Sequence, residues 1–215
     1  MIARPQPLTL ALPKGRLLGS IAARLAEIGI ATAALDPKDR RLVRDCPWPD
    51  SPHGLRVLLL KPDDVPTYVE HGAADVGVVG RDVLLEREAD LSVVSETGLG
   101  RCRMVVAAPE GFVGVALGHA LRVASKYPRI AAAHYAARGE EVEVIFVQGS
   151  VETAPLAGLA DVIVDLVETG ETLRQNGLVV RETVCEVSAV VVANRARRKL
   201  RRAEVTALGT ALSRR

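Results

Sequence analysis

Short apolar runs alternate along this chain with longer segments in which apolar residues recur every three or four positions. Leu8–Leu12 and Leu55–Leu60 are such runs, and each ends abruptly at polar residues. Between them, the helical spacing extends from Leu17 to Ile28 and stops at Gly29. Buried strands that lead through polar loops into amphipathic helices are typical of βαβ units. The pattern therefore predicts an α/β protein.

The same pattern restarts in the second half of the chain. We expect strands at 121–124, 142–147 and 162–166, and two long extended runs at 102–108 and 179–192. These features predict two lobes with mainly parallel sheets joined by two crossing strands, like a type II periplasmic binding protein. The first lobe would comprise 1–103 and 180–215, and the second 104–179. A cleft between two such lobes is the usual ligand site.

The basic segment at the end of the chain admits two interpretations. Clustered arginines are typical of a nucleic-acid patch, but apolar residues recur at helical spacing through the segment. We therefore favour one terminal amphipathic helix with a solvated basic side. Its apolar face would carry Leu200, Ala203, Ala207 and Ala211, flanked by Val205, Leu208 and Leu212.

Composition narrows the classes of protein further. Of the 215 residues 48% are hydrophobic but only 3% are aromatic, so the core must be aliphatic. A net charge of +2 gives no overall electrostatic case for nucleic acid. No apolar run is long enough to cross a bilayer, and the first residues do not resemble a secretory signal. We expect a cytoplasmic protein that contacts neither membrane nor nucleic acid.

Cysteine and histidine are scattered, without the spacing of a disulfide framework or a zinc site. We expect ordinary thiols and no metal ion held by protein side chains. The residues concerned are Cys46, Cys102, Cys185, His53, His71, His119 and His134.

The loop after the strand at 162–166 has the composition of a phosphate site. Thr169 is a candidate N-cap, and Gly170 lets the backbone approach a ligand closely. The N–H groups of residues 170–172 would then point out of the helix start and attract an anion. Carboxylates alone would repel phosphate, but they accept hydrogen bonds from sugar hydroxyls. The loop therefore suggests a ribose 5-phosphate group, although a purely structural turn remains an alternative. Its residues are Asp165, Glu168, Thr169, Gly170, Glu171 and Thr172.

At this point the chain resembles a known family. The run from Glu152 to Leu173, ETAPLAGLADVIVDLVETGETL, is similar to the signature of the ATP phosphoribosyltransferase catalytic subunit. LALPKGRLL, DVPTYVEHGAADVGVVGRDVLLE and RVASKYP extend the likeness over nearly the whole chain. The resemblance is to the short form of the family, without a C-terminal regulatory domain. In that family the Glu152–Leu173 segment holds phosphoribosyl pyrophosphate.

The resemblance also implies roles for cations in the first lobe. Lys14 and Arg16 match a loop that lines the active site, although an isolated KGR is also compatible with a solvated turn. The family supplies an arginine to the pyrophosphate from a segment that here reads Asp39-Arg40-Arg41-Leu42. Arg40 is the nearer match, Arg41 could serve, and an exposed charged hairpin remains an alternative.

We assign two further residues, Lys61 and Asp75, to ATP binding. Many relatives carry Arg where Lys61 stands. Lys keeps the charge but loses the planar donor fork, so a contact of this residue with ATP would rest on charge alone.

The reaction that the resemblance implies is attack of adenine N1 of ATP on C1 of phosphoribosyl pyrophosphate, which releases pyrophosphate. N1 already carries a lone pair, so no strong base is needed. Mg²⁺ would arrive chelated by the substrate. Short family members work with a regulatory subunit related to histidyl-tRNA synthetase, so we expect that partner, a homodimer of the isolated chain, and no histidine inhibition without the partner.

Two other classes fit parts of the pattern. A two-lobed solute-binding protein has the same crossing topology but is normally exported and needs no cationic loop. A phosphoribosyltransferase of the single-sheet type would carry an acidic pair directly before its phosphate loop. Release of pyrophosphate that depends on ATP would distinguish the assigned activity from binding without turnover.

Overall fold

The computed structural model describes residues 6–36, 38–116 and 118–213, which divide into two compact units. Unit 1 comprises Met1–Gly100 and Ser188–Arg215, and unit 2 comprises Arg101–Val187. Unit 2 is one continuous stretch, whereas unit 1 is assembled from both ends of the chain. The boundaries differ from those expected at 103/104 and 179/180, because the last long strand belongs to unit 2 over its whole length.

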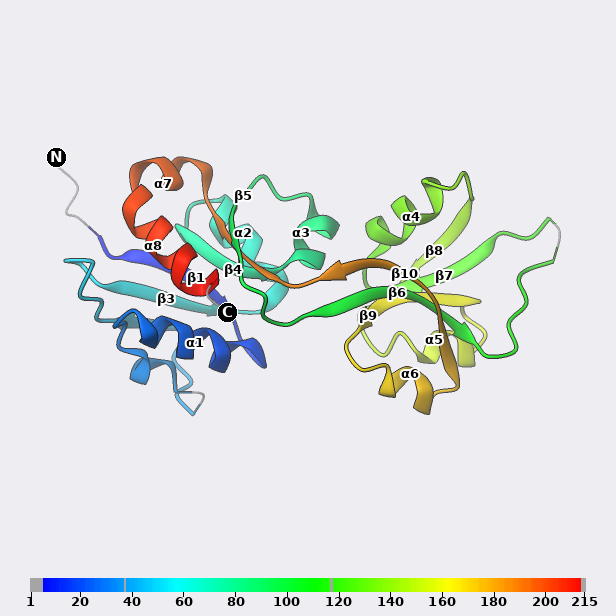
Figure 1. Cartoon of the computed structure of the whole chain (residues 1–215). Helices are drawn as coiled ribbons and strands as arrows, with labels where there is room; N and C mark the ends of the chain where they lie inside the picture. Colours follow the sequence, from blue (N-terminus) through cyan, green and yellow to red (C-terminus); the bar gives the residue numbers. More distant parts are fainter. Residues whose placement is uncertain (1–5, 37, 117, 214–215) are drawn as a thin grey trace. The chain divides into compact units, whose positions relative to one another are not determined.

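Unit 1 is built on a mixed sheet (Figure 1), whose order within the described residues is β2-β3-β1-β4-β11-β5. Strand β1 runs parallel to β3 and β4, and the other pairs are antiparallel. The strands are β1 (Leu8–Pro13), β2 (Val43–Cys46), β3 (Leu55–Leu60), β4 (Val76–Gly80), β5 (Ser92–Glu96) and β11 (Ala189–Ala193). The helices are α1 (Leu17–Glu27), α2 (Val65–Glu70), α3 (Arg81–Arg87), α7 (Arg195–Leu200) and α8 (Arg202–Ser213), with 3₁₀ turns at Thr32–Leu35 and Pro62–Asp64.

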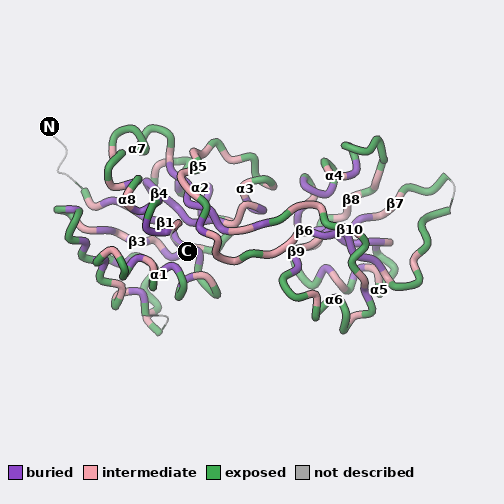
Figure 2. Tube along the Cα trace, in the orientation of Figure 1, coloured by how far each residue is buried: buried purple, intermediate pink, exposed green. Residues whose placement is uncertain are grey.

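Helices cover both faces of this sheet, and much of the trace of its strands is coloured as buried in Figure 2. Two clusters of mainly aliphatic residues pack between the sheet and the helices. On one face Leu10 of β1 packs in the same cluster as Ile21 of α1 and Leu208 of α8. On the other face Val79 of β4 lies in a cluster with Val65 of α2. Strands buried on both faces explain the near-continuous apolar runs of the sequence.

Unit 2 is built on a second mixed sheet, with the order β10-β6-β9-β7-β8 in the described residues. Strand β7 runs parallel to β8 and β9, whereas β6 is antiparallel to β9 and β10. The strands are β6 (Cys102–Pro109), β7 (Leu121–Ser125), β8 (Val142–Phe146), β9 (Val162–Val167) and β10 (Leu178–Val187). The helices are α4 (Pro128–Ala136), α5 (Thr153–Leu156) and α6 (Glu171–Gln175).

Two aliphatic clusters cover the faces of the second sheet. Ile130 of α4 packs with Val123 and Val164 on one face. Leu173 of α6 and Ala154 of α5 pack on the other. Because β7, β8 and β9 are parallel, the loops that follow them meet at one edge of the sheet.

The α/β class with two sheets is confirmed, and a single-sheet phosphoribosyltransferase is excluded. The sheets are mixed rather than mainly parallel, because parallel pairs occur only among β1, β3, β4 and β7, β8, β9. The second extended run, expected as one element, is two strands that belong to different units, β10 and β11, with Ser188 between them.

The end of the chain corrects the expectation of one terminal helix. The backbone leaves helical geometry at Arg201, with φ −120° and ψ 39°, so the segment forms α7 and then α8. Leu200 is 77% exposed and Ala203 is exposed, so this half of the predicted apolar face is wrong. Ala211 of the same face is buried, Ala207 packs against the core, and the flanking set Val205, Leu208 and Leu212 is buried and attaches α8 to the sheet. No helix among the described residues is both long and apolar enough to cross a membrane.

Candidate active-site residues

Two lysines lie side by side where β1 and β3 end. The parallel register pairs Pro13 with Leu60, and the N–H of Lys14 donates to the Leu60 carbonyl oxygen at 2.8 Å. Lys14 and Lys61 are therefore the first residues beyond the strands at the same edge, and both are exposed. In parallel sheets this carboxyl edge is where ligands bind. The structure thus brings these two predicted residues together.

Arg16 stands at the same edge, at the start of α1. Gly15 before it has φ +103°, a conformation that turns the chain sharply from strand to helix. Arg16 is exposed and is the residue that precedes the first turn of α1. The helix has 11 residues, and its unpaired N–H groups add partial positive charge beside the two lysines.

The loop that carries Arg40 reaches this edge because β2 is antiparallel to β3. Val43 pairs with Leu58, and the N–H of Leu59 donates to the Leu42 carbonyl at 2.8 Å. The residues immediately before Leu42 therefore run beside the end of β3, near Lys61. The structure places Arg40 with the other predicted cations of unit 1.

A buried arginine shapes this loop. The Arg44 side chain, in a residue only 5% exposed, donates to the backbone carbonyls of Arg41 and Ala34 at 2.9 and 2.7 Å. It also donates to the carbonyls of Asp36, at 2.9 Å, and Asp39. One guanidinium thus ties together both arms of the loop, a role that sequence reasoning missed because the acceptors are backbone atoms.

Arg40 and Arg41 differ in what they contact. Arg41 Nη2 and Nε lie 2.7 and 2.9 Å from Asp39 Oδ2, and this pairing lowers the pKa of Asp39 to about 2. Arg40 is exposed and forms no ion pair with any of the residues that the structure describes. Arg41 therefore already pairs with a carboxylate, whereas Arg40 does not pair with any described residue.

Asp75 lies elsewhere. It directly precedes β4, and its Oδ2 accepts from the N–H of Thr9, at the beginning of β1, at 2.8 Å. This is the amino edge of the parallel strands, opposite the edge of Lys14. Asp75 is 6% exposed, and its carboxylate lies 3.2 Å from Arg197 Nε and 3.7 Å from Arg201 Nη1. Asp75 and Lys61 therefore lie at opposite edges of the sheet. The Asp75 carboxylate instead stabilises the position of α7 and α8 through its two arginine partners.

In unit 2, the strand and loop predicted to bind phosphate are present at the carboxyl edge of β9. Gly170, not Thr169, precedes the first turn of α6, and its φ of +80° is the left-handed conformation that glycine adopts at no steric cost. Thr169 Oγ1 instead accepts from the N–H of Glu171 at 3.4 Å. The hydroxyl of Thr172 is exposed and donates to no residue of the described ranges.

The carboxylates of this loop face different surroundings. Burial raises the pKa of Asp165 to about 6, and the charge of Glu152 adds to the effect. Glu168 is exposed. Glu171 accepts from Arg174 and Gln175 at 2.6 and 2.7 Å, so its carboxylate is turned along α6 and only its backbone remains at the helix start.

Two cations at these edges were not singled out from the sequence. Lys126 follows β7, whose Ser125 pairs with Val164 of the neighbouring β9, and its charge opposes the rise in the pKa of Asp165. Arg81 follows β4 in unit 1 and pairs with Glu96. The signal that identified Lys14, a cation directly after an apolar run, could have found both.

Comparison with known proteins shows which family the chain is similar to. A family model described as ATP phosphoribosyltransferase matches residues 61–214. The ATP phosphoribosyltransferase of Sorangium cellulosum is 54% identical over 196 residues, which cover 91% of this chain and 90% of the relative.

Solved structures give the same result. The ATP phosphoribosyl transferase (HisG:HisZ) complex from Thermotoga maritima superposes with a TM-score of 0.80 at 35% identity, covering 95% of each chain. The alkanesulfonate-binding protein SsuA from Xanthomonas axonopodis pv. citri shares only the fold, with a TM-score of 0.58 at 13% identity over 98% of this chain and 73% of that one. The chain belongs to the ATP phosphoribosyltransferase family, the enzymes that join ATP to phosphoribosyl pyrophosphate in the first step of histidine biosynthesis.

Proposed function

We propose that the cations at the carboxyl edge of the unit 1 sheet carry the charge chemistry of this reaction. The observation that supports this most directly is the strand register, which gathers Lys14 and Lys61 at one edge and extends the Arg40 loop beside them. In the proposal Lys14, Arg16 and Arg40 stabilise the diphosphate that leaves C1. Lys61 contacts the phosphates of ATP as a point charge.

In unit 2, the loop after β9 would bind the ribose 5-phosphate group. The left-handed Gly170 removes the side chain where phosphate approaches, and the exposed hydroxyls of Thr169 and Thr172 donate to its oxygens. Asp165 and Glu168 accept from the ribose hydroxyls. Glu171 contributes its backbone rather than its carboxylate, because Arg174 already pairs with that carboxylate.

The chemical step needs no strong general base from the protein, because adenine N1 attacks C1 with its own lone pair. As the bond from C1 to oxygen breaks, the departing diphosphate gains negative charge, and the three cations of unit 1 stabilise it more strongly than they stabilise the substrate. Mg²⁺ would come bound to the diphosphate oxygens, because the side chains that meet this group are cations and cannot ligate a metal; when bound it neutralises part of the same charge.

For this chain we also propose a regulatory partner. The solved relative from Thermotoga maritima is a complex of HisG with HisZ, and we propose that this chain likewise assembles with a regulatory subunit related to histidyl-tRNA synthetase. A homodimer of the isolated chain in the cytoplasm, where both substrates occur, is part of the same proposal.

The neighbouring arginines of the loop offer a matched test of the site. We expect Arg40→Ala to lower the rate of ATP-dependent pyrophosphate release by about 10² to 10³, the usual cost of one donor to developing charge. Arg41→Ala removes the same charge but breaks only an exposed pair with Asp39, so it should retain most of the activity. Equal losses in both variants would show that total loop charge matters, and a larger loss for Arg41→Ala would exclude Arg40.

A further inference from the structure

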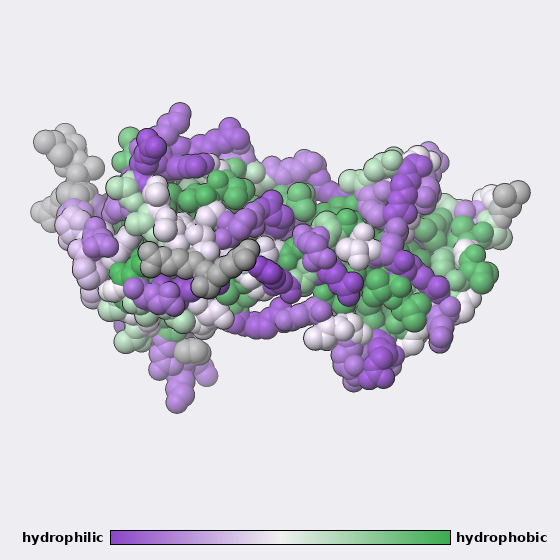
Figure 3. All heavy atoms as spheres, in the orientation of Figure 1, coloured by the Kyte–Doolittle hydropathy of each residue, from purple (hydrophilic) through white to green (hydrophobic). Residues whose placement is uncertain are grey.

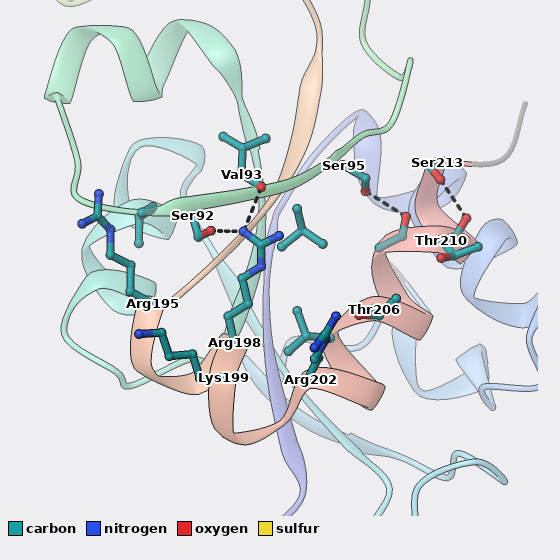
Figure 4. A pocket seen from close by; sticks show the side chains of 14 residues that line it. Ser92, Val93, Ser95, Arg195, Arg198, Lys199, Arg202, Thr206, Thr210 and Ser213 are labelled. Atoms are coloured by element: carbon teal, nitrogen blue, oxygen red, sulfur yellow. Dashed lines mark hydrogen bonds between the residues drawn. The ribbon is translucent and has the colours of Figure 1, made fainter.

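A polar groove lies in unit 1 between the edge strand β5 and the two C-terminal helices (Figure 4). Its volume is about 850 Å³. One wall is the outer side of β5, and the other is formed by α7 and α8. The Asp75 contacts of Arg197 and Arg201, which hold α7 and α8 in place, lie outside it. The residues assigned above to substrate binding do not line it either.

Close contact between α8 and β5 fixes the floor of this groove. A Cβ on Gly209 would come within 2.6 Å of Val94 Cγ1, so only glycine permits this approach. The hydroxyl of Ser95 donates to the Gly209 carbonyl at 2.8 Å and joins the strand to the helix. The groove is therefore a built feature of the packing rather than a gap between mobile side chains.

The helical wall has two chemically different halves. Positions 195 and 199 are one turn apart on α7, positions 202, 206, 210 and 213 follow at intervals of three or four residues on α8, and all six line the groove. The first three are Arg195, Lys199 and Arg202, and the last three are Thr206, Thr210 and Ser213. Cations thus fill one half and hydroxyls the other.

Positive charge in the first half is only partly balanced. Arg195 lies 2.7 Å from Asp90 Oδ1. Arg198 donates to the hydroxyl of Ser92 and, at 3.4 Å, to the carbonyl of Val93, both neutral groups (Figure 4). Lys199 and Arg202 form no ion pair within the described ranges, and no acidic residue lines the groove. Hydrophilic side chains also gather over α7 on the face seen in Figure 3.

We propose that this groove is the docking surface for an acidic polypeptide segment of the regulatory partner, an inference that rests on the partner proposed above. Charge complementarity argues for carboxylates opposite Lys199 and Arg202. A compact anion such as phosphate could occupy only the cationic end of the groove. The hydroxyl groups of the other half could bind the backbone or polar side chains of an extended polypeptide, which favours a polypeptide segment as the ligand. Single-stranded nucleic acid is less suitable, because the groove has no aromatic side chain on which a base could stack.

A double charge reversal tests the proposal without disturbing the fold. Lys199→Glu with Arg202→Glu breaks no ion pair among the described residues. The helix dipole favours the new carboxylate at residue 202, at the start of α8, and opposes the one at residue 199, in the last turn of α7. The matched control is Arg87→Glu together with Lys38→Glu, which changes the charge equally at exposed positions of unit 1 outside the groove. Arg87 lies in the last turn of α3, as Lys199 lies in the last turn of α7, and its side chain donates only at 3.4 Å to the Thr67 hydroxyl among the described residues, so little stability is lost.

The measurement is the dissociation constant of the complex with the purified regulatory subunit, by calorimetry at about 50 mM and about 500 mM salt, ionic strengths at which screening differs strongly. We expect the groove variant to bind at least about tenfold more weakly at low salt and to lose most of its salt dependence. The control should bind like the wild type, and all three proteins should unfold at similar temperatures.

Three other results would contradict the proposal. Equal affinity of groove variant and wild type would refute docking in this groove while leaving the partner in place. Failure of the wild type to bind the subunit at either salt would refute the partner and this docking site together. If a labelled single-stranded oligonucleotide bound the wild type and was lost only in the groove variant, while the subunit bound both proteins alike, the groove would be a nucleic-acid site.

Discussion

Asp165→Asn should stabilise the enzyme and impair it at the same time. In the folded chain, burial in β9 raises the pKa of Asp165 from 3.8 to about 6. Below about pH 4 the carboxyl is protonated in both folded and unfolded chains, so burial costs nothing. As pH rises to about 6, the unfolded chain releases its proton first, and folding becomes less favourable. Above that pH the buried carboxyl is ionised in the folded chain too, and the full penalty applies. The difference between the two pKa values corresponds to a loss of up to about 3 kcal/mol in the free energy of unfolding.

Asparagine has nearly the same shape and keeps the oxygen that accepts from the N–H of Leu166 at 2.8 Å. We therefore expect the variant to be more stable than the wild type at pH 8, by up to about 3 kcal/mol, with the difference fading towards pH 4. Urea unfolding of both proteins across this range measures it. Affinity for phosphoribosyl pyrophosphate should fall about ten- to hundredfold, because one charged acceptor is lost.

A second carboxylate of unit 2 provides the opposite control. Arg122 donates to Asp161 and lowers its pKa, so Asp161 stabilises the fold above its unfolded pKa and loses that contribution as pH falls through the folded value. Asp161→Asn should therefore lower the free energy of unfolding at pH 8, and the difference from the wild type should disappear in acid.

The prediction for Asp165 has a clear refutation. If Asp165→Asn is no more stable than the wild type at pH 8, burial of the carboxylate does not destabilise the fold.

Three further predictions concern single residues. Arg16→Ala should lower the single-turnover rate, measured with both substrates saturating, by about 10² to 10³. The midpoint of thermal unfolding should hardly change, because the side chain is exposed. A normal rate that requires higher substrate concentrations would mean that Arg16 contributes to substrate binding and not to the chemical step. Thr172→Ala should weaken binding of phosphoribosyl pyrophosphate in calorimetry by about 1.5–3 kcal/mol, and unchanged affinity would place the phosphate elsewhere. Arg44→Ala removes a side-chain donor from four backbone carbonyls, so it should lower the free energy of unfolding by about 2–4 kcal/mol, and Arg44→Lys should restore only part of it.

Strands and the loops after them were predictable because the signal is local. The apolar runs at Leu8 and Leu55 end at Lys14 and Lys61, and parallel pairing brings those ends together. Contacts that depend on distant partners were not predictable. Asp75 was assigned to ATP binding, but its carboxylate is committed to Arg197 and Arg201, more than a hundred residues away in sequence.

Short-range spacing was also ambiguous at the end of the chain. One helical period placed Leu200 in an apolar face, but the turn at Arg201 changes the phase, and α8 then buries Val205, Leu208 and Leu212. The difference between Arg40 and Arg41 was not predictable either, because the pairing of Arg41 with Asp39 depends on side-chain geometry.

The position of β11 has a consequence for the order in which the chain folds during synthesis. This strand lies between β4 and β5 and pairs with both, yet it is made after all of unit 2. Until residues 189–193 leave the ribosome, β5 has no strand to pair with, and the cations at the edge of β1 belong to an unfinished sheet. Unit 2, a continuous stretch, can fold as soon as it emerges. The sheet that carries Lys14 and Lys61 is therefore completed only after the segment with the phosphate loop has been made.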